Sequence, residues 1–193
     1  MKKVTLLLFV FLFFAGMSFA ESEVNLKLGL DPSGKFKAES SAGGGLEPSE
    51  FGVNLSGEYL YRAYEILRVG AGLEYLFPRG VDIAGGEKYS WLPFYATVLV
   101  NPLKSAPGLY LKGNIGYSIL FNVVDFPEGV DPRSKKGGIY WALGAGYEFG
   151  FGLVFEAMYG SYSSSYNRSE AETFDLTYGK FGINIGYKFN FYY

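Results

Sequence analysis

Cysteine and histidine are both absent from the 193-residue chain, and each absence excludes a kind of chemistry. Without cysteine the protein cannot form disulfides, so its stability must come from packing, backbone hydrogen bonds or a lipid environment. Without histidine it lacks the usual general base of serine hydrolases and of many lipid-modifying enzymes. We therefore expect no enzymatic activity, no catalytic residue and no cofactor.

A marked excess of one charge sign is also missing, since 17 Lys and Arg face 19 Asp and Glu. This balance gives no reason to expect nucleic-acid binding. The one long apolar run, residues 4–15, follows two lysines and precedes Ser18-Phe19-Ala20, the pattern of a secretory signal peptide. We predict cleavage after Ala20, which leaves residues 21–193 as one domain. An uncleaved membrane anchor is the alternative, but the run is shorter than the roughly 20 apolar residues that a spanning helix needs.

Over most of the remaining chain, apolar residues recur with a period of two, which predicts β-strands. Eight strands are expected, at residues 23–30, 50–61, 67–77, 89–100, 108–121, 138–149, 152–162 and 181–193. The strand at 89–100 is apolar on both faces, so its pattern does not fix its register. Pro93 indicates irregular pairing in that strand.

The connections between these strands alternate in length. Short ones are expected at residues 63–66, 101–108 and 150–152, and longer ones, rich in Gly, Pro and charge, at 31–50, 78–88, 122–137 and 163–173. This alternation predicts an all-β fold: an eight-stranded antiparallel up-and-down transmembrane β-barrel with both termini at the end of the short turns.

Glycines and asparagines decide which face of the barrel points inward. They gather on the polar face of the strands: Gly29, Gly52, Gly70, Gly72, Gly116, Gly144, Gly146, Gly160, Gly182 and Gly186, with Asn25, Asn54, Asn114 and Asn184. Small residues suit the narrow interior of an eight-stranded barrel, whereas a solvent-facing surface has no steric need for them. The bulky apolar face is therefore predicted to point outward, toward lipid.

Aromatic residues collect near the predicted strand ends. Those expected to form girdles at the two membrane interfaces are Tyr59, Tyr61, Tyr75, Phe77, Tyr89, Trp91, Tyr147 and Phe149. Girdles of this kind are typical of membrane barrels. Ordinary strand propensity is the other explanation for these aromatic residues.

Charged side chains on the inward face of the strands nearly cancel. They are Lys27, Glu58, Arg68, Glu74, Lys112, Glu148, Glu156, Lys180 and Lys188. Buried charges persist only when they are paired and hydrogen-bonded. We predict a lumen closed by Glu–Lys/Arg networks. A narrow, porin-like water-filled channel is the alternative, and some of these side chains could instead lie at the rims of the barrel.

The chain ends on a strand whose apolar face carries aromatic residues to the last position. The sequence resembles bacterial outer-membrane β-barrels of the OmpA/OmpX-like eight-stranded class over the whole mature chain. In that class an alternating apolar pattern ending on an aromatic residue is an assembly signal, which here corresponds to Ile185, Tyr187, Phe189, Phe191 and Tyr193. A terminal Tyr, where Phe is commoner, is a mild departure. The resemblance implies insertion into the outer membrane by the assembly machinery.

These observations favour a non-catalytic, monomeric barrel in the bacterial outer membrane that supports the envelope or presents its long loops to a surface ligand. Candidate loop contacts are Phe126, Arg133, Lys135, Lys136, Tyr162, Tyr166 and Arg168. Asp125, Glu128 and Asp131 match no full calcium-binding motif, so no metal site is expected. A soluble, lipocalin-like periplasmic carrier is the remaining alternative, because alternation also fits a barrel with its apolar face inside.

Overall fold

A computed structural model describes residues 22–40, 43–80, 88–124, 134–167 and 173–191. The signal peptide expected at residues 1–20 lies outside these ranges and stays a prediction. The described strands are β1 (Ser22–Ser40), β2 (Gly43–Pro48), β3 (Gly52–Tyr64), β4 (Leu67–Arg79), β5 (Lys88–Val100), β6 (Leu109–Val124), β7 (Ser134–Glu148), β8 (Leu153–Asn167) and β9 (Thr173–Phe191). In the described part of the chain, no helix has both the length and the apolar character needed to cross a membrane.

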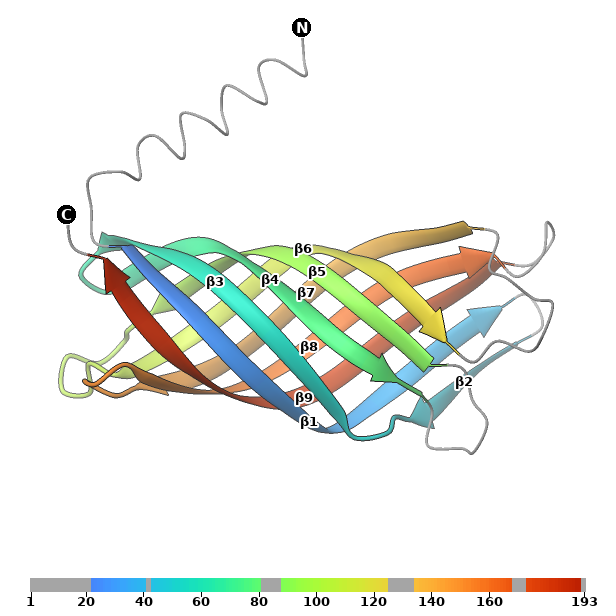
Figure 1. Ribbon diagram of the computed structural model, residues 1–193, viewed down its shortest axis with the longest axis horizontal. Helices are drawn as coiled ribbons and strands as arrows, with labels where there is room; N and C mark the ends of the chain where they lie inside the picture. The colour runs from blue at the N-terminus through green and yellow to red at the C-terminus, as the bar shows by residue number, and fades with distance from the viewer. Residues whose placement is uncertain (1–21, 41–42, 81–87, 125–133, 168–172, 192–193) are drawn as a thin grey trace, which may run out of the picture.

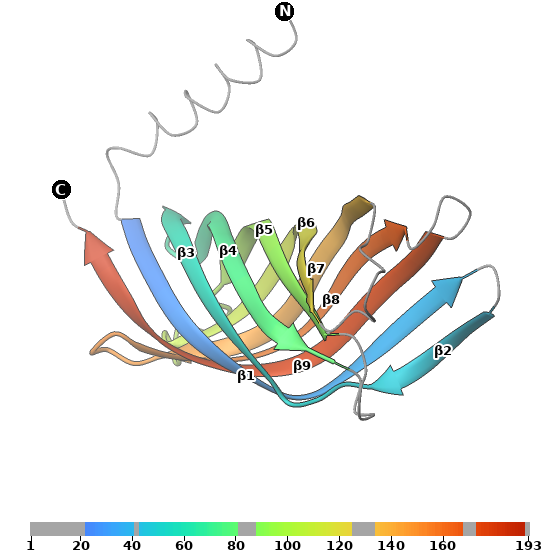
Figure 2. The same ribbon diagram turned by 45° about the vertical axis from the view of Figure 1, so that its right-hand side comes forward.

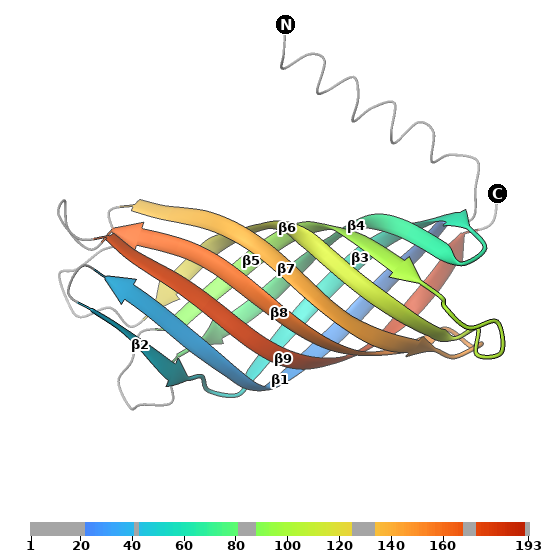
Figure 3. The same cartoon turned by 180° about the vertical axis from the view of Figure 1, so that it is seen from behind.

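Eight of these strands close into one antiparallel barrel, which confirms the predicted fold. Each strand from β3 to β9 pairs with its neighbour in sequence, and β1 pairs with β3 on one side and with β9 on the other. In Figure 1, β1 begins and β9 ends at the same end of the barrel, where the short connections lie. Figure 3 shows β6, β7, β8 and β9 side by side from behind. Closure gives every barrel strand two partners, as a strand in hydrocarbon requires.

The ninth strand, β2, is a short hairpin partner of the far half of β1. Pairing between β1 and β3 ends at Asp31 and Gly52, and β1 then pairs with β2 from Lys35 onward. Figure 2 shows this hairpin projecting at the end opposite the termini. The prediction of a connection over residues 31–50 was therefore wrong. The apolar alternation breaks there because β1 shifts register against β9 between Leu30 and Ser33.

Other strands also run further than predicted toward the long connections. β6 extends to Val124, β7 begins at Ser134, and β8 and β9 pair as far as Asn167 and Thr173. In the extensions of β8 and β9 the outward residues, such as Ser163, Ser165 and Thr177, are no longer apolar, so a search for one continuous apolar face ends too early.

Apolar residues point outward over most of the barrel wall. Leu111, Phe155 and Ile185 are 53%, 39% and 42% exposed, whereas Lys112 and Glu156 are only 4% and 2% exposed. The predicted inversion, with apolar residues outside and charges inside, is confirmed in this zone.

On β8, β9 and β1 the residue types on the two faces exchange toward the long connections. The outward positions become polar, with Ser33, Lys35, Lys37, Ser161, Ser163 and Thr177, and the inward positions become apolar or aromatic, with Phe36, Tyr162, Tyr166, Leu176 and Tyr178. This part of the wall is organised like a barrel that stands in water. The prediction of one orientation for the whole chain is therefore wrong in this zone.

Two predicted girdle residues on β5, Tyr89 and Trp91, lie inside the barrel. Trp91 is fully buried and Tyr89 is 8% exposed. Phe94 lies opposite Leu73 of β4, and both point outward, which directs Trp91 into the lumen. The irregular pairing expected in this strand is a shift of register against β6 between Ser90 and Trp91. The girdle prediction was wrong here because a strand that is apolar on both faces does not reveal its own orientation.

The remaining predicted girdle residues lie on the outer wall. Six of them are half-buried or exposed there: Tyr59, Tyr61, Tyr75, Phe77, Tyr147 and Phe149. Several touch one another edge to face, such as Tyr147 and Phe149, whose ring centroids are 4.9 Å apart. This geometry is favourable for aromatic pairs.

Candidate functional site

The centre of the lumen holds a closed ring of two lysines and two glutamates, which we call the central quartet. Lys27 of β1 lies 2.6 Å from Glu58 of β3 and 2.9 Å from Glu156 of β8. Lys112 of β6 lies 3.0 Å from Glu156 and also contacts Glu58. All four side chains are buried, and each ion has two partners of opposite sign. Such pairing is the condition under which a charge remains buried.

A second group, the upper quartet, lies nearer the long connections. Lys180 of β9 is 3.0 Å from Asp31 of β1 and 2.8 Å from Glu74 of β4. Arg79, at the end of β4, pairs with the same aspartate. The Arg79 guanidinium also donates hydrogen bonds to the Val53 carbonyl at 2.6 Å and to the Tyr178 hydroxyl at 3.1 Å. These contacts attach β1, β3, β4 and β9 to one another across the lumen.

A third group, the lower quartet, lies at the end of the short connections. Arg68 contacts Glu23 at 2.8 Å and Glu148 at 2.7 Å, and Lys188 contacts the same two glutamates. Arg62, which is partly exposed at the rim, lies 3.3 Å from Glu23. Each of the three quartets thus contains two acids and two bases, so each is neutral by itself.

Tyrosines connect the quartets to the barrel wall. The hydroxyl groups of Tyr95 and Tyr110 donate to Glu58 at 2.8 Å and to Glu156 at 2.9 Å. The Tyr162 hydroxyl lies 3.2 Å from Glu74. These bonds occupy carboxylate lone pairs that the ammonium groups leave open, as the inventory of acceptor sites requires.

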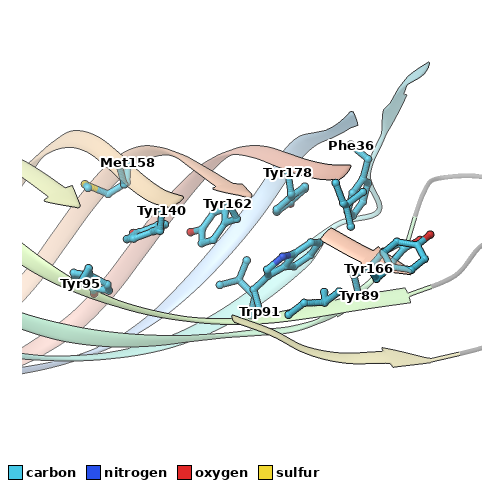
Figure 4. Close-up of a cluster of buried hydrophobic side chains, with 13 residues drawn as sticks. Phe36, Tyr89, Trp91, Tyr95, Tyr140, Met158, Tyr162, Tyr166 and Tyr178 are labelled. Atoms are coloured by element: carbon cyan, nitrogen blue, oxygen red, sulfur yellow. The ribbon is translucent and has the colours of Figure 1, made fainter. Parts of the chain in front are cut away.

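Above the upper quartet, the lumen is filled by aromatic rings, which we call the aromatic plug: Phe36, Tyr89, Trp91, Tyr162, Tyr166 and Tyr178 (Figure 4). Tyr178 stacks against Phe36 with centroids 4.7 Å apart and against Trp91 at 5.4 Å. The polar edges of the plug are satisfied, since the Trp91 indole donates to the Ser164 hydroxyl at 3.2 Å and the Tyr89 and Tyr166 hydroxyls lie 3.3 Å apart.

Glycines make room for these side chains. A Cβ at Gly186 would lie 2.3 Å from Cγ of Lys27, and one at Gly72 would lie 2.6 Å from the ring of Tyr95. Both distances are far below van der Waals contact. The predicted role of inward glycines, which is to leave space in a narrow lumen, is therefore seen at the central quartet.

Between the central and upper quartets lies a cavity of about 20 Å³, bounded by Glu58, Glu74, Tyr95 and Tyr140 among others. This volume accommodates about one water molecule. Among the described residues, no group of three or more metal-ligating side chains is placed to hold a metal ion. The contacts seen among the described lumen side chains are ion pairs and hydrogen bonds.

The structure brings all nine predicted charges to the inner wall, where they fall into the three quartets. Glu148 is the least buried of them and lies at the rim. Three members were missed: Glu23, Asp31 and Arg79. Glu23 and Asp31 share the inward parity of Lys27. Glu23 lies inside the predicted strand 23–30 and could have been found from that parity alone, whereas Asp31 required the strand to be extended by one residue. Arg79 could not, because a shift of register between Leu76 and Arg79 changes which residues face inward.

Other predicted residues have different outcomes. Ile185, Tyr187, Phe189 and Phe191 lie on the outer face of β9, and Tyr193 lies outside the described residues. Their role as an assembly signal stays a prediction. Of the candidate loop contacts, Tyr162 and Tyr166 are buried in the plug, which corrects their assignment to an exposed loop. Lys135 and Lys136 are exposed, whereas Phe126, Arg133 and Arg168 lie outside the described residues, as do Asp125, Glu128 and Asp131.

A closed antiparallel barrel with an apolar outer wall and a charged interior defines the class of transmembrane β-barrels. The chain belongs to the family described as outer membrane protein beta-barrel domain, which it matches over residues 5–189. It is therefore a bacterial outer-membrane protein. A search of curated proteins finds no match.

Solved structures with the same fold include three outer-membrane barrels. Neisserial surface protein A is 14% identical, with a TM-score of 0.57 over 86% of this chain and 97% of that one. OprG of Pseudomonas aeruginosa is 13% identical, with a TM-score of 0.53 over 91% and 97%. Ail, the attachment invasion locus protein of Yersinia pestis, is 14% identical, with a TM-score of 0.52 over 89% and 99%. At this identity the likeness concerns the fold alone.

Proposed function

We propose that this protein is a non-conducting, non-catalytic structural barrel of the outer membrane, with a lumen closed by the three quartets and the aromatic plug. The observation that carries the proposal is the filling of the lumen: four successive layers of side chains from β1 to β9 leave a cavity of about 20 Å³ between the central and upper quartets. An ion in transit would have to break a neutral quartet, and removing one partner from a buried ion pair costs about 3–5 kcal/mol.

The absence of histidine supports a role without catalysis, because no serine or carboxylate of this chain has an imidazole partner. A monomer is favoured because each barrel strand is paired on both sides and leaves no barrel edge for a second copy. The protein would contribute to the envelope through its outer wall, which contacts lipid, and through the exposed residues at the end of the long connections.

Recordings in planar lipid bilayers test the closed lumen. The purified wild-type barrel is expected to give no stepwise conductance. A variant that opens all four layers is expected to conduct. It carries Glu58→Ala and Lys112→Ala in the central quartet, Glu74→Ala and Lys180→Ala in the upper quartet, Arg68→Ala and Glu148→Ala in the lower quartet, and Trp91→Ala and Tyr178→Ala in the plug. Variants carrying any one of these pairs alone should stay silent, because the other three layers remain. Each variant is first shown to be folded by its heat-dependent mobility on an SDS gel.

Steady conductance by the wild-type protein would contradict the closed lumen and favour the narrow-channel alternative. Release of the protein from membranes by carbonate, without detergent, would contradict an integral barrel and favour a soluble carrier.

A further inference from the structure

A pocket of about 250 Å³ lies at the end of the barrel that carries the short connections. Its walls come from the end of β3 and the β3–β4 turn, with Arg62, Glu65 and Ile66, and from the β5–β6 turn, with Leu103 and Lys104. All five side chains are exposed. Membrane barrels have their short connections in the periplasm, so this pocket lies at the periplasmic surface.

Hydrogen bonds of Asn101 hold the two turns of the pocket in one arrangement. The Asn101 backbone N–H donates to the Ile66 carbonyl at 2.9 Å, which joins the two turns. The Asn101 side-chain amide donates to the carbonyls of Pro107 at 3.0 Å and Leu109 at 3.1 Å, across the β5–β6 turn. The pocket is therefore preformed, and a ligand that enters it does not have to order the turns, which lowers the entropic cost of binding.

The pocket carries an excess of positive charge. Arg68 and Glu148 also line it, but they belong to the lower quartet and are neutralised there. The pocket adds two bases to that quartet, Arg62 and Lys104, against one acid, Glu65. Within the described part of the chain Lys104 forms no ion pair, so its ammonium group is available to an anion.

Apolar side chains lie beside these charges. Ile66 and Leu103 are 47% and 48% exposed, and Pro107 lines the pocket with them. An inorganic anion would leave this apolar surface in water, whereas an anion that carries an aliphatic group would cover it. The pocket is slightly smaller than the about 300–1,000 Å³ of sites for drug-sized ligands. Its size therefore suits one or two amino-acid residues.

We propose that this pocket binds the terminal carboxylate of a short periplasmic peptide whose last residue is aliphatic. The carboxylate accepts hydrogen bonds from the Lys104 ammonium group, and the last side chain covers Leu103 and Ile66. The Glu65 carboxylate accepts a hydrogen bond from a peptide N–H. Capture of a terminal carboxylate is a recurring mode of peptide recognition. The site lies at the barrel mouth and does not depend on whether the lumen is closed.

Fluorescence anisotropy with the full mature barrel in nanodiscs of zwitterionic lipid tests the site, because both faces of a nanodisc are accessible. The probe is the peptide Gly-Ala-Leu with a neutral fluorophore at its N-terminus and a free terminal carboxylate. The matched probe ends in a carboxamide. It is expected to bind the wild-type barrel about tenfold more weakly, since a hydrogen bond to a charged group is lost.

The variant Lys104→Glu is expected to bind the carboxylate probe about tenfold more weakly, because a repulsion replaces an attraction. Its affinity for the carboxamide probe should stay within about twofold of wild type. The matched control, Lys135→Glu, makes the same change of charge at an exposed position of β7 at the other end of the barrel. It should bind both probes within about twofold of wild type.

A second variant, Leu103→Ser, tests the apolar wall and keeps every charge of the pocket. The wild-type barrel is expected to bind Gly-Ala-Leu about tenfold more tightly than Gly-Ala-Gly, since the leucine side chain leaves water. In Leu103→Ser this preference should fall to about threefold or less.

Four results would overturn the proposal. They are equal binding of the carboxylate and carboxamide probes, wild-type affinity in Lys104→Glu, an equal loss in Lys135→Glu, and an unchanged preference for leucine in Leu103→Ser. Displacement of the probe by acetate at the same concentration would overturn the peptide as the occupant. Heat-dependent gel mobility establishes that each variant is folded before binding is measured.

Discussion

Glu156 shows how a charge is kept inside a membrane barrel. Its carboxylate receives Lys27, Lys112 and the Tyr110 hydroxyl, all within 3.0 Å. With its acceptor sites occupied and two cations beside it, the carboxylate loses little when it leaves water. Removing the Glu156 carboxylate destabilises the central quartet, because the ammonium groups of Lys27 and Lys112 then share only Glu58.

We predict that Glu156→Gln lowers the free energy of unfolding by about 3–5 kcal/mol, the usual cost of breaking a buried pair. The double variant Glu156→Gln with Lys112→Met restores neutrality and should recover most of that loss. Urea unfolding in lipid vesicles, followed by tryptophan fluorescence, measures both. If the double variant is less stable than the single variant by a further additive amount, the two side chains are not coupled as the contacts require.

Single residues also show how far the sequence could be interpreted. The inward glycines and the alternation of charge with apolar residues were enough to place nine of the quartet residues on the inner wall. They were not enough to find Arg79, since its inward direction depends on a shift of register that arises only when β4 pairs with β5. A sequence pattern shows which residues of a strand share a face, but it does not show the register shifts that arise when the strand pairs with its neighbours.

Among the strands, β5 shows most clearly that pairing can fix an orientation that the sequence pattern leaves open. Both of its faces are apolar, and only its pairing with β4 and β6 shows that Trp91 is inside. Trp141 of β7, by contrast, lies on the outer wall and is 39% exposed. These two are the only tryptophans of the chain, so they report on the two sides of the wall.

We expect brominated lipids to quench the fluorescence of Trp141 strongly and that of Trp91 weakly. The variant Trp91→Phe leaves Trp141 as the sole tryptophan, and Trp141→Phe leaves Trp91, so each reporter is measured alone in the same vesicles. Quenching requires contact between the indole and a bromine atom on an acyl chain. Equal quenching of the two would mean that β5 is turned the other way.

Strand β9 crosses from apolar to polar surroundings along one face. Ile185 lies in the middle of its apolar row, whereas Thr177 lies beyond the last apolar residue, Phe181. An arginine introduced on this face should therefore have an effect that depends on position.

Ile185→Arg is expected to destabilise the folded barrel by about 2–4 kcal/mol and Thr177→Arg by about 0–1 kcal/mol, as the cost of a lipid-facing cation falls from the membrane centre to its surface. Unfolding in urea from vesicles of the same lipid gives both values. A cost at Thr177 as large as that at Ile185 would contradict the boundary between the apolar and the polar part of the outer face of β9.

For the molecule as a whole, the orientation in the membrane follows from the asymmetry of the connections. Lys135 lies at the end of the long connections and Lys104 in a short turn between β5 and β6, and both are exposed. Long connections face the outside of the cell in barrels of this kind.

The natural absence of cysteine makes this orientation simple to test. With Lys135→Cys, a membrane-impermeant maleimide should label the protein on intact cells. With Lys104→Cys, labelling should require permeabilised outer membranes. Each variant contains a single thiol, so the position of the label is unambiguous. The reverse pattern would place the short turns outside the cell.

The neutral quartets have a consequence for how the barrel forms. The members of the central quartet come from β1, β3, β6 and β8, so no contiguous hairpin contains a complete set. A partly inserted sheet would hold Lys112 and Glu156 inside the bilayer without the partners that β1 and β3 supply, at a high energetic cost. Intermediates are therefore disfavoured until β9 meets β1, and insertion is a cooperative event in which closure of the wall and neutralisation of its interior take place together.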